Sequence, residues 1–336
     1  MPGTMTPEEP CTERGRDEAA GALAQRRRQK SIEDPGGFVV VDKPAGCTSH
    51  DVVARCRRLL GTRKVGHAGT LDPDATGVLI VGVGRATRLL RFASALRKTY
   101  VGEVVFGATT TTLDASGVLT GRFDMSDVAL EAVRETARGL TGRIQQVPPM
   151  VSAVKVGGRR LHELAREGVE VERAPRSVEV FRFEVFETGE NGCLRILVEC
   201  SSGTYVRVLA ADLGARLGGG AYLRILRRVS VGSFTDAEAL ALEEVTPSAL
   251  RPPEELVRDF PGAVASDDLA QALGFGRTVD RPSLGVVGDG PWAVLDKAGR
   301  LVAMCEPVGL ERVKPVVVVQ TSGSPRVGAS PTVGAE

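Results

Sequence analysis

A carboxylate in a glycine-rich loop is the residue of this sequence best placed to do chemistry. Asp72 lies within the segment GHAGTLDPDATGVL at residues 66–79, and the region from Val52 to Tyr100 holds ten Lys or Arg but only two acidic residues, Asp72 and Asp74. Such a basic region suits a polyanion, because Lys and Arg neutralise phosphates. A carboxylate there would repel phosphate, so it indicates a reactive role on a polyanion. The structural alternative is that the Asp-Pro pair only initiates a turn.

Length and composition predict a globular protein with room for two domains. The chain has 336 residues, 42% of them hydrophobic, and a net charge of +1. Its longest apolar stretches, residues 78–83 and 316–319, are far shorter than the roughly 20 residues that a membrane-spanning helix needs. The first residues are polar and acidic and lack the apolar core of a secretory signal. We therefore expect a cytoplasmic protein without a membrane segment.

The cysteines and histidines predict neither a metal site nor a disulfide framework. Six cysteines are scattered without a C-x-x-C pair, and the three histidines form no spaced ligand set with them. The sequence also lacks a G-x-x-x-x-G-K-S/T loop, and Gly82-Val83-Gly84 lacks the third glycine of a dinucleotide-binding turn. We expect no structural zinc and no ATP or NAD.

Strand and helix patterns place the Asp72 loop inside an α+β domain. Strands are predicted at residues 38–41, 78–83, 98–106, 178–186 and 194–200, and helices at 49–60, 87–96, 130–140 and from about 207 to 218. Ser49 is the predicted N-cap of the first helix. Most strands connect through hairpin-like spacings or long excursions, so we expect a mixed, mainly antiparallel sheet flanked by helices rather than a doubly wound parallel sheet.

The remaining segments predict accessory regions. Residues 1–35 mix Pro, Gly, Glu and Arg without an apolar period, which predicts a disordered N-terminal arm. Residues 155–176 read as a short amphipathic lobe with a basic outer face. Short strands at 284–287, 292–296, 301–305 and 312–319 predict a small β-barrel within a domain at 259–320, and residues 321–336 predict a disordered tail.

The Asp72 loop resembles the catalytic motif of the bacterial tRNA pseudouridine-55 synthases, the TruB family. Five further segments resemble motifs of that family in the same order: DKPAG at 42–46, KTY at 98–100, PPMVSAVK at 148–155, GTYVR at 203–207 and LRR at 226–228. The likeness covers about residues 36–250, with a weaker similarity to PUA RNA-binding domains from about 260 to 320. It implies a pseudouridine synthase catalytic domain at 36–258, with an RNA-gripping thumb insert at about 150–176 and a PUA-like domain behind it.

The resemblance implies an isomerase that acts on tRNA. The target is one uridine of the T-loop, position 55, which is flipped out and changed from an N-glycosidic to a C-glycosidic link without a cofactor. Asp72 is implied to be the essential carboxylate, and Arg207 to pair with it, which would lower the carboxyl pKa. Tyr100 is implied to stack on the target base.

The resemblance also implies a set of substrate-binding residues. These are His67, Lys43, Tyr205, Leu226, Lys64, Arg159 and Arg160. The histidine would take the space that the flipped base leaves. The tyrosine and leucine would line the pocket, although both residue types also fit structural roles. The two lysines would contact phosphates, and the two arginines would be contacts of the thumb.

The sequence departs from the family pattern at three points, and two other functions remain as alternatives. Val151 stands where many relatives carry a tyrosine, Thr111 stands where an additional aspartate is common while Asp114 is retained, and the N-terminal arm has no counterpart in the motifs. The alternatives are a non-catalytic tRNA-binding chaperone and a subunit of a guide-RNA-dependent pseudouridine synthase. The thumb-like insert favours the stand-alone class. We expect a monomer whose partner is the T-loop and elbow of tRNA.

Overall fold

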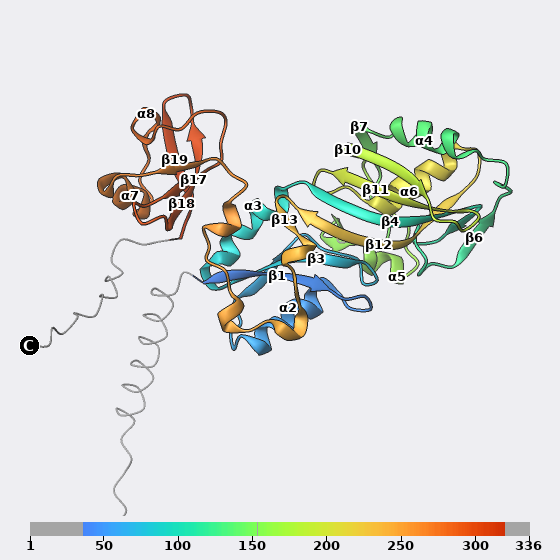
Figure 1. The fold of residues 1–336 in the computed structure, drawn as a ribbon, viewed down its shortest axis with the longest axis horizontal. Coiled ribbons are helices and arrows are strands. Elements are labelled where there is room, and N and C mark those ends of the chain that lie inside the picture. Colours follow the sequence, from blue (N-terminus) through green and yellow to red (C-terminus); the bar gives the residue numbers. More distant parts are fainter. Residues whose placement is uncertain (1–35, 153, 320–336) are drawn as a thin grey trace, which may run out of the picture. The chain divides into compact units, whose positions relative to one another are not determined.

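The computed structural model describes residues 36–152 and 154–319 (Figure 1). They divide into two compact units, Gly37–Asp259 and the residues from Phe260 onward. The predicted arm at 1–35 and tail at 321–336 lie outside the described residues. None of the helices in the described ranges is long and apolar enough to cross a bilayer.

A ten-stranded sheet forms the centre of the first unit (Figure 1). Its main path runs β14-β1-β3-β12-β4-β11-β10-β7, with β13 paired to β12 and β2 paired to β3. All its pairs are antiparallel except β1 with β14 and β3 with β12, so the predicted mixed, mainly antiparallel sheet is confirmed. The strands are β1 Gly37–Lys43, β2 Val65–Ala68, β3 Thr76–Val83, β4 Lys98–Phe106, β7 Gly142–Gln146, β10 Arg176–Glu187, β11 Cys193–Cys200, β12 Ala221–Val231, β13 Phe234–Thr235 and β14 Leu240–Ala241.

Helices bury their apolar stripes against this sheet in two clusters. In one, Val133 of α4 and Leu209 of α6 pack with side chains of β4, β10, β11 and β12. In the other, Val52 and Cys56 of α2 pack against β1 and β3. The helices of this unit are α2 Ser49–Leu59, α3 Leu90–Ala95, α4 Leu130–Arg138, α5 Leu161–Arg166 and α6 Val206–Arg216, with the 3-10 helices η1 Gly84–Leu89, η2 Asp236–Glu238, η3 Leu242–Glu244, η4 Pro247–Ala249 and η5 Glu255–Val257.

Two small hairpins form sheets of their own beside the main one in the topology. One consists of β5 Ala108–Thr110 and β6 Leu119–Arg122. The other consists of β8 Lys155–Val156 and β9 Arg159–Arg160, and it leads directly into α5. The predicted amphipathic lobe at 155–176 therefore begins as a hairpin and a short helix.

One sequence prediction about the first unit is wrong, and one central strand was not predicted. Thr48, not Ser49, caps α2, because its hydroxyl accepts the amide proton of Asp51 while the Asp51 carboxylate accepts from the Thr48 amide. The central strand β12 is also absent from the prediction. It carries Arg224, Arg227 and Arg228, whose charges hide the alternation typical of a strand.

The second unit is a curled five-stranded sheet with two helices (Figure 1). Its strand order is β15-β17-β18-β19-β16, and Trp292, Val294 and Val302 lie in its core. The elements are β15 Gly262–Val264, α7 Asp267–Gly274, β16 Val279–Asp280, α8 Arg281–Leu284, β17 Trp292–Leu295, β18 Leu301–Val308 and β19 Arg312–Val318. The strand predicted at 284–287 is wrong, because Gly285 ends α8 in the left-handed conformation at φ 68° and the chain continues as a loop.

Candidate active site

Asp72 lies in the short loop between β2 and β3, and contacts on both sides of it hold the loop in place. The hydroxyl of Ser49, in the first turn of α2, accepts from the Leu71 amide at 2.9 Å and donates to the Leu71 carbonyl at 3.3 Å. The buried ammonium group of Lys43 donates to the Pro73 carbonyl at 2.8 Å. The backbone is therefore fixed immediately before and after Asp72, which orients its carboxylate.

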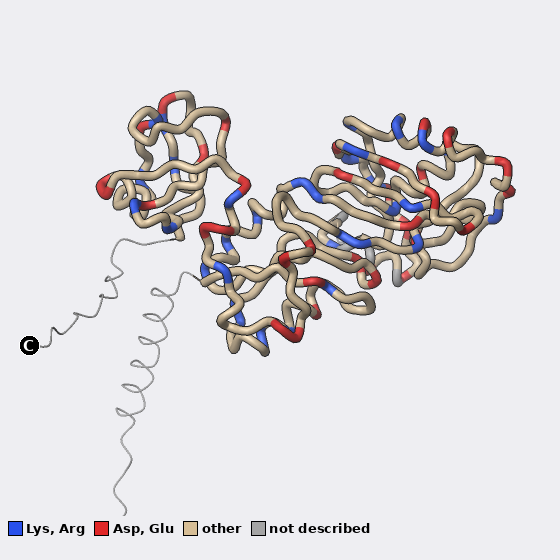
Figure 2. The backbone as a smooth tube through the Cα atoms, viewed as in Figure 1, with Lys and Arg blue, Asp and Glu red and all other residues tan. Residues whose placement is uncertain are grey.

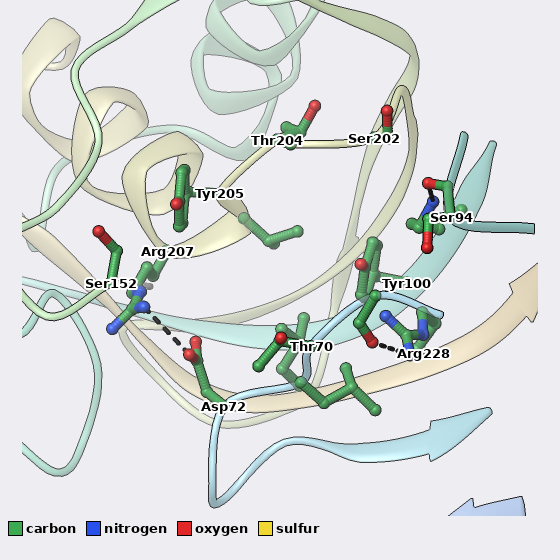
Figure 3. Close-up of a pocket in the computed structure, with 16 residues that line it drawn as sticks. Thr70, Asp72, Ser94, Tyr100, Ser152, Ser202, Thr204, Tyr205, Arg207 and Arg228 are labelled. Carbon is green, nitrogen blue, oxygen red and sulfur yellow. Dashed lines mark hydrogen bonds and ion pairs between the residues drawn. The ribbon is translucent and has the colours of Figure 1, made fainter. Parts of the chain in front are cut away.

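Arg207 joins two carboxylates at this site. Its guanidinium donates to Asp72 Oδ1 at 3.1 Å and to Asp114 Oδ2 at 3.4 Å, and also to the Val151 carbonyl at 2.8 Å. The Arg207 side chain is 4% exposed, whereas that of Asp72 is 43% exposed and borders open space. Figure 3 shows the Asp72 carboxylate facing Arg207. One oxygen of Asp72 is thus occupied by a fixed cation while the carboxylate stays accessible.

The net pKa shift of Asp72 differs in sign from the predicted one. The partly buried position of this carboxyl raises its pKa above the ordinary value of 3.8, and the negative charge of Asp114 raises it further. Arg207 lowers the pKa as predicted, but its effect is smaller than that of burial. Asp72 therefore takes up a proton at a higher pH than an ordinary aspartate does.

Asp114 is a site residue that sequence reasoning did not assign. It follows Leu113, whose φ of 64° is unusual for a residue with a side chain. Its Oδ1 accepts from the hydroxyls of Thr112 at 2.5 Å and Ser116 at 2.6 Å and from the Ser116 amide at 3.1 Å, which leaves Oδ2 for Arg207. The sequence shows only an aspartate between hydroxyl residues in a turn. This pattern is common and does not indicate that Arg207 is its partner.

A cavity of about 250 Å³ opens beside this pair. It brings together five of the predicted site residues, which are Asp72, Tyr100, Tyr205, Arg207 and Leu226. Tyr100 is 7% exposed, and burial raises the pKa of its phenol, so the ring enters the cavity as a neutral aromatic. In Figure 3, Asp72 and Arg207 lie on one side of the cavity and Tyr100 with Arg228 on the other.

Tyr205 precedes α6, and its backbone is bound at both polar atoms by one side chain. The buried amide of Gln146 accepts from the Tyr205 N–H at 3.0 Å and donates to the Tyr205 carbonyl at 3.3 Å. The Arg207 guanidinium lies 6.0 Å from the centre of the Tyr205 ring. Gln146 thus fixes the start of the helix that carries Arg207.

The sequence matches known proteins over most of its length. Residues 57–206 match the family described as TruB family pseudouridylate synthase (N terminal domain), and residues 207–259 match the tRNA pseudouridylate synthase B C-terminal domain. The tRNA pseudouridine synthase B of Rhodococcus jostii is 47% identical over 89% of this chain and 98% of its own. The chain belongs to the TruB family.

Other TruB family members and a solved structure agree with this assignment. The tRNA pseudouridine synthase B of Nocardia farcinica is 45% identical over 88% of this chain and 96% of its own, and that of Mycobacterium ulcerans is 44% identical over 84% and 95%. A chain in the crystal structure of a Cbf5-Nop10-Gar1 complex is 26% identical, with a TM-score of 0.68 and 87% of each chain covered. The fold is therefore the α+β pseudouridine synthase fold, and its curled C-terminal sheet is of the PUA-like kind.

Lys43 of this TruB chain does not lie where a phosphate contact would need it. The residue is 0% exposed, and its ammonium donates to the carbonyls of Pro44 at 2.8 Å, Cys47 at 2.6 Å and Pro73 at 2.8 Å. All three of its protons therefore have partners. The phosphate contact predicted for Lys43 conflicts with this geometry, which assigns the lysine to the support of the Asp72 loop.

The other predicted binding residues lie outside the lining of the cavity. His67 is in β2, its ring lies 5.4 Å from that of His50, and burial lowers its pKa to about 4, so the imidazole is neutral. Lys64 is exposed just before β2, and Arg159 forms an ion pair with Glu167. The Arg160 side chain is outside what is described. Within the described ranges, His, Cys, Asp and Glu side chains form no metal-binding group.

Proposed function

We propose that this chain, as a monomer in the cytoplasm, converts the T-loop uridine at position 55 of tRNA to pseudouridine without a cofactor. The observation that carries the proposal is the Asp72 carboxylate, held at 3.1 Å by the buried Arg207 at the mouth of a cavity that Tyr100 lines. Relatives that are 44–47% identical over most of the chain bear the name tRNA pseudouridine synthase B. Together they support base isomerisation in tRNA as the reaction.

Asp72 starts the reaction as an ionised carboxylate. It attacks the ribose or the base, or takes the proton from C2′, and each of these steps needs a carboxylate anion next to the nucleotide. The N1–C1′ bond breaks, the uracil turns within the cavity, C5 bonds to C1′, and the C5 proton leaves. Arg207 holds one Asp72 oxygen throughout, which fixes the direction of approach of the other.

Tyr100 and Leu226 form the walls that hold the base. Both side chains line the cavity, and an aromatic ring such as that of Tyr100 is a stacking platform worth about 1–3 kcal/mol per base. The stacking of the uracil on Tyr100 does not depend on which edge of the uracil faces Asp72. The base can therefore turn between cleavage and reattachment without losing its support.

The uridine must leave its stack before it can reach the cavity, which costs a few kcal/mol. We assign His67 to the space that the flipped base vacates. Its imidazole is neutral, so it places no charge among the stacked bases. The exposed Lys64 is assigned to a phosphate near the same loop. Arg159, and with it Arg160, is assigned to the thumb contact with the RNA.

A subunit of a guide-RNA-dependent synthase is the second candidate, because this fold is shared with a chain that was solved in a complex with other proteins, the Cbf5-Nop10-Gar1 complex. The segment with β8, β9 and α5 argues for stand-alone action, since the insert at 150–176 is a mark of that class. A non-catalytic tRNA chaperone would need no carboxylate beside the cavity.

The test is to incubate the purified protein alone with an unmodified tRNA transcript and to map pseudouridine by carbodiimide-adduct primer extension. We expect one stop, at the T-loop uridine, and none when that uridine is replaced by cytidine. A product that forms only after a guide RNA is added would support the second candidate. Refolding of the transcript with no product at all would support the chaperone.

A further inference from the structure

Two buried cations lie at the end of the cavity away from Asp72. Lys98 is 5% exposed and Arg228 is 0% exposed, and both line the cavity together with Tyr100. Among the described residues, neither of them has an ion-pair partner. Figure 3 shows Arg228 next to Tyr100, on the side opposite the Asp72–Arg207 pair. Two like charges are thus buried together without a carboxylate to offset them.

Backbone carbonyls hold both cations in place. The Lys98 ammonium donates to the carbonyls of Ser94 at 2.8 Å and Leu96 at 2.6 Å, at the end of α3. Arg228 donates from Nε to the Val78 carbonyl at 2.7 Å and from Nη2 to the Gly69 carbonyl at 3.1 Å. Neutral donors could form hydrogen bonds to these carbonyls equally well. Burying a charge without an opposite charge costs free energy. Hydrogen bonds to the backbone therefore do not by themselves account for two cations at this place.

The groups around Lys98 leave this end of the cavity positive at neutral pH. Burial, with the nearby charge of Arg228, lowers the pKa of Lys98 to about 8. On the neighbouring strand β11, burial raises the pKa of the Cys200 thiol to about 11, so it is neutral. Tyr100 on β4 is also neutral, since burial raises its pKa. The carboxylate whose charge reaches Tyr100 is Asp72, across the cavity.

We propose that Lys98 and Arg228 stabilise the negative charge that the uracil carries during isomerisation. This inference rests on the proposed function. When the N1–C1′ bond breaks, its electron pair stays with the base and spreads over N1 and the two carbonyl oxygens. The electron pair forms the new bond when C5 attacks C1′, and the C5 proton is then released to water, which restores the ring. Fixed charges in a site that excludes water stabilise such a transient anion without reorganising.

A backbone phosphate fits this end of the cavity less well than the base does. The phosphates of a flipped nucleotide stay at the mouth of a pocket, whereas exposures of 5% and 0% place Lys98 and Arg228 in its depth. The base is the part of the nucleotide that enters. Cations at this depth therefore face the base.

The test measures single-turnover tritium release from tRNA that carries [5-³H]uridine, at saturating enzyme, from about pH 6 to about pH 10. For the wild type we expect the rate to fall as the pH rises through about 8, where Lys98 loses its proton. Lys98→Arg should keep its rate above this pH, because an arginine stays protonated. Lys98→Met should lose roughly 10²-fold at neutral pH and show no break near pH 8.

Controls separate this inference from a structural role and from the proposed function. Arg182→Met changes an exposed cation outside the basic region of residues 52–100 and should leave the rate and its pH profile unchanged. Thermal midpoints and tRNA affinities show whether each variant is folded, and the wild-type and Lys98→Arg profiles decide the question if Lys98→Met does not fold. A rate that rises through pH 8, or a Lys98→Met rate within about threefold of the wild type, would overturn the inference alone. No product from the wild type at any pH would overturn the proposed function and this inference together.

Discussion

The carboxylate of Asp72 shows how opposing neighbours set the properties of one side chain. Burial and Asp114 raise its pKa, while Arg207 and Lys43 lower it. The residue types in the loop make Asp72 a candidate, and the resemblance of the segment GTYVR to a TruB motif makes Arg207 its candidate partner. The net sign of the pKa shift could not be predicted, since it depends on burial and on Asp114, which is distant in sequence.

The raised pKa predicts how activity depends on acid. Because the proposed reaction needs Asp72 in its ionised form, the single-turnover rate should fall as the pH drops through a value above 3.8, the ordinary pKa of an aspartate. Rates measured at saturating enzyme from neutral to acid pH check this. A rate that stays flat down to about pH 4 would contradict the raised pKa.

Asp114→Asn should shift the acid limb of the dependence of the rate on pH in a defined direction. Removing this negative charge lowers the pKa of Asp72, so the acid limb should move to lower pH. The neutral-pH rate should fall by roughly 10- to 100-fold, because Arg207 loses one of its two carboxylate partners and holds Asp72 less firmly. Asp124→Asn is a matched control, since that carboxylate accepts from Ser126 on the surface. An acid limb that moves to higher pH in Asp114→Asn would contradict the account.

At the scale of elements, local patterns predicted strands and helices well where the buried positions are apolar and the charged residues are exposed. The predicted strand at 98–106 has the bounds of β4, and the predicted sheet class is confirmed. Strand β12 was missed because two of its arginines are neutralised by residues far away in sequence. Arg224 pairs with Glu103 at 2.9 Å, and Arg227 binds Asp42 with two bonds of 2.9 and 3.0 Å. The phosphate contact predicted for Lys43 failed for a related reason, because its burial depends on the Asp72 loop folding over it.

The close approach of β3 and β12 is one element-scale contact that positions the site. Gly77 has φ +100°, and a Cβ placed there would lie 2.2 Å from the Arg228 carbonyl. Gly77→Ala should therefore lower the free energy of unfolding by more than about 2 kcal/mol, since strain and a backbone clash add. Denaturant unfolding measures this effect.

Gly46→Ala is the matched control for that contact. Gly46 also has a positive φ, of +77°, but nothing lies within 4 Å of an added Cβ. It should cost only the conformational strain, about 1 kcal/mol. Equal losses in the two variants would show that the contact between β3 and β12 does not matter for stability.

At the scale of the whole molecule, charge is distributed unevenly along the chain. The region from Val52 to Tyr100 holds ten Lys or Arg and two acids, whereas residues 260–319 hold six Lys or Arg and seven acids. Figure 2 shows basic and acidic residues interspersed in the second unit. The ionic part of tRNA binding should therefore come mainly from the first unit.

Lys64→Ala tests this distribution. The residue is exposed, and the loss of one phosphate contact should weaken tRNA binding and reduce the slope of log affinity against log salt by about 1. Lys297→Ala serves as control, because Asp267 already neutralises that lysine at 2.8 Å. Binding isotherms at several salt concentrations give both slopes. Equal slopes for wild type and Lys64→Ala would remove Lys64 from the RNA contact.

The central claim is that the ionised carboxylate of Asp72 carries out the isomerisation of tRNA uridine. The most direct measurement is tritium release from [5-³H]uridine tRNA by wild type and Asp72→Asn, with tRNA affinity measured on the same preparations. We predict release by the wild type and none above background by Asp72→Asn, with affinities that agree within about threefold, because the amide keeps the shape of the side chain and loses only its charge. Release by Asp72→Asn at a rate near that of the wild type would contradict the claim.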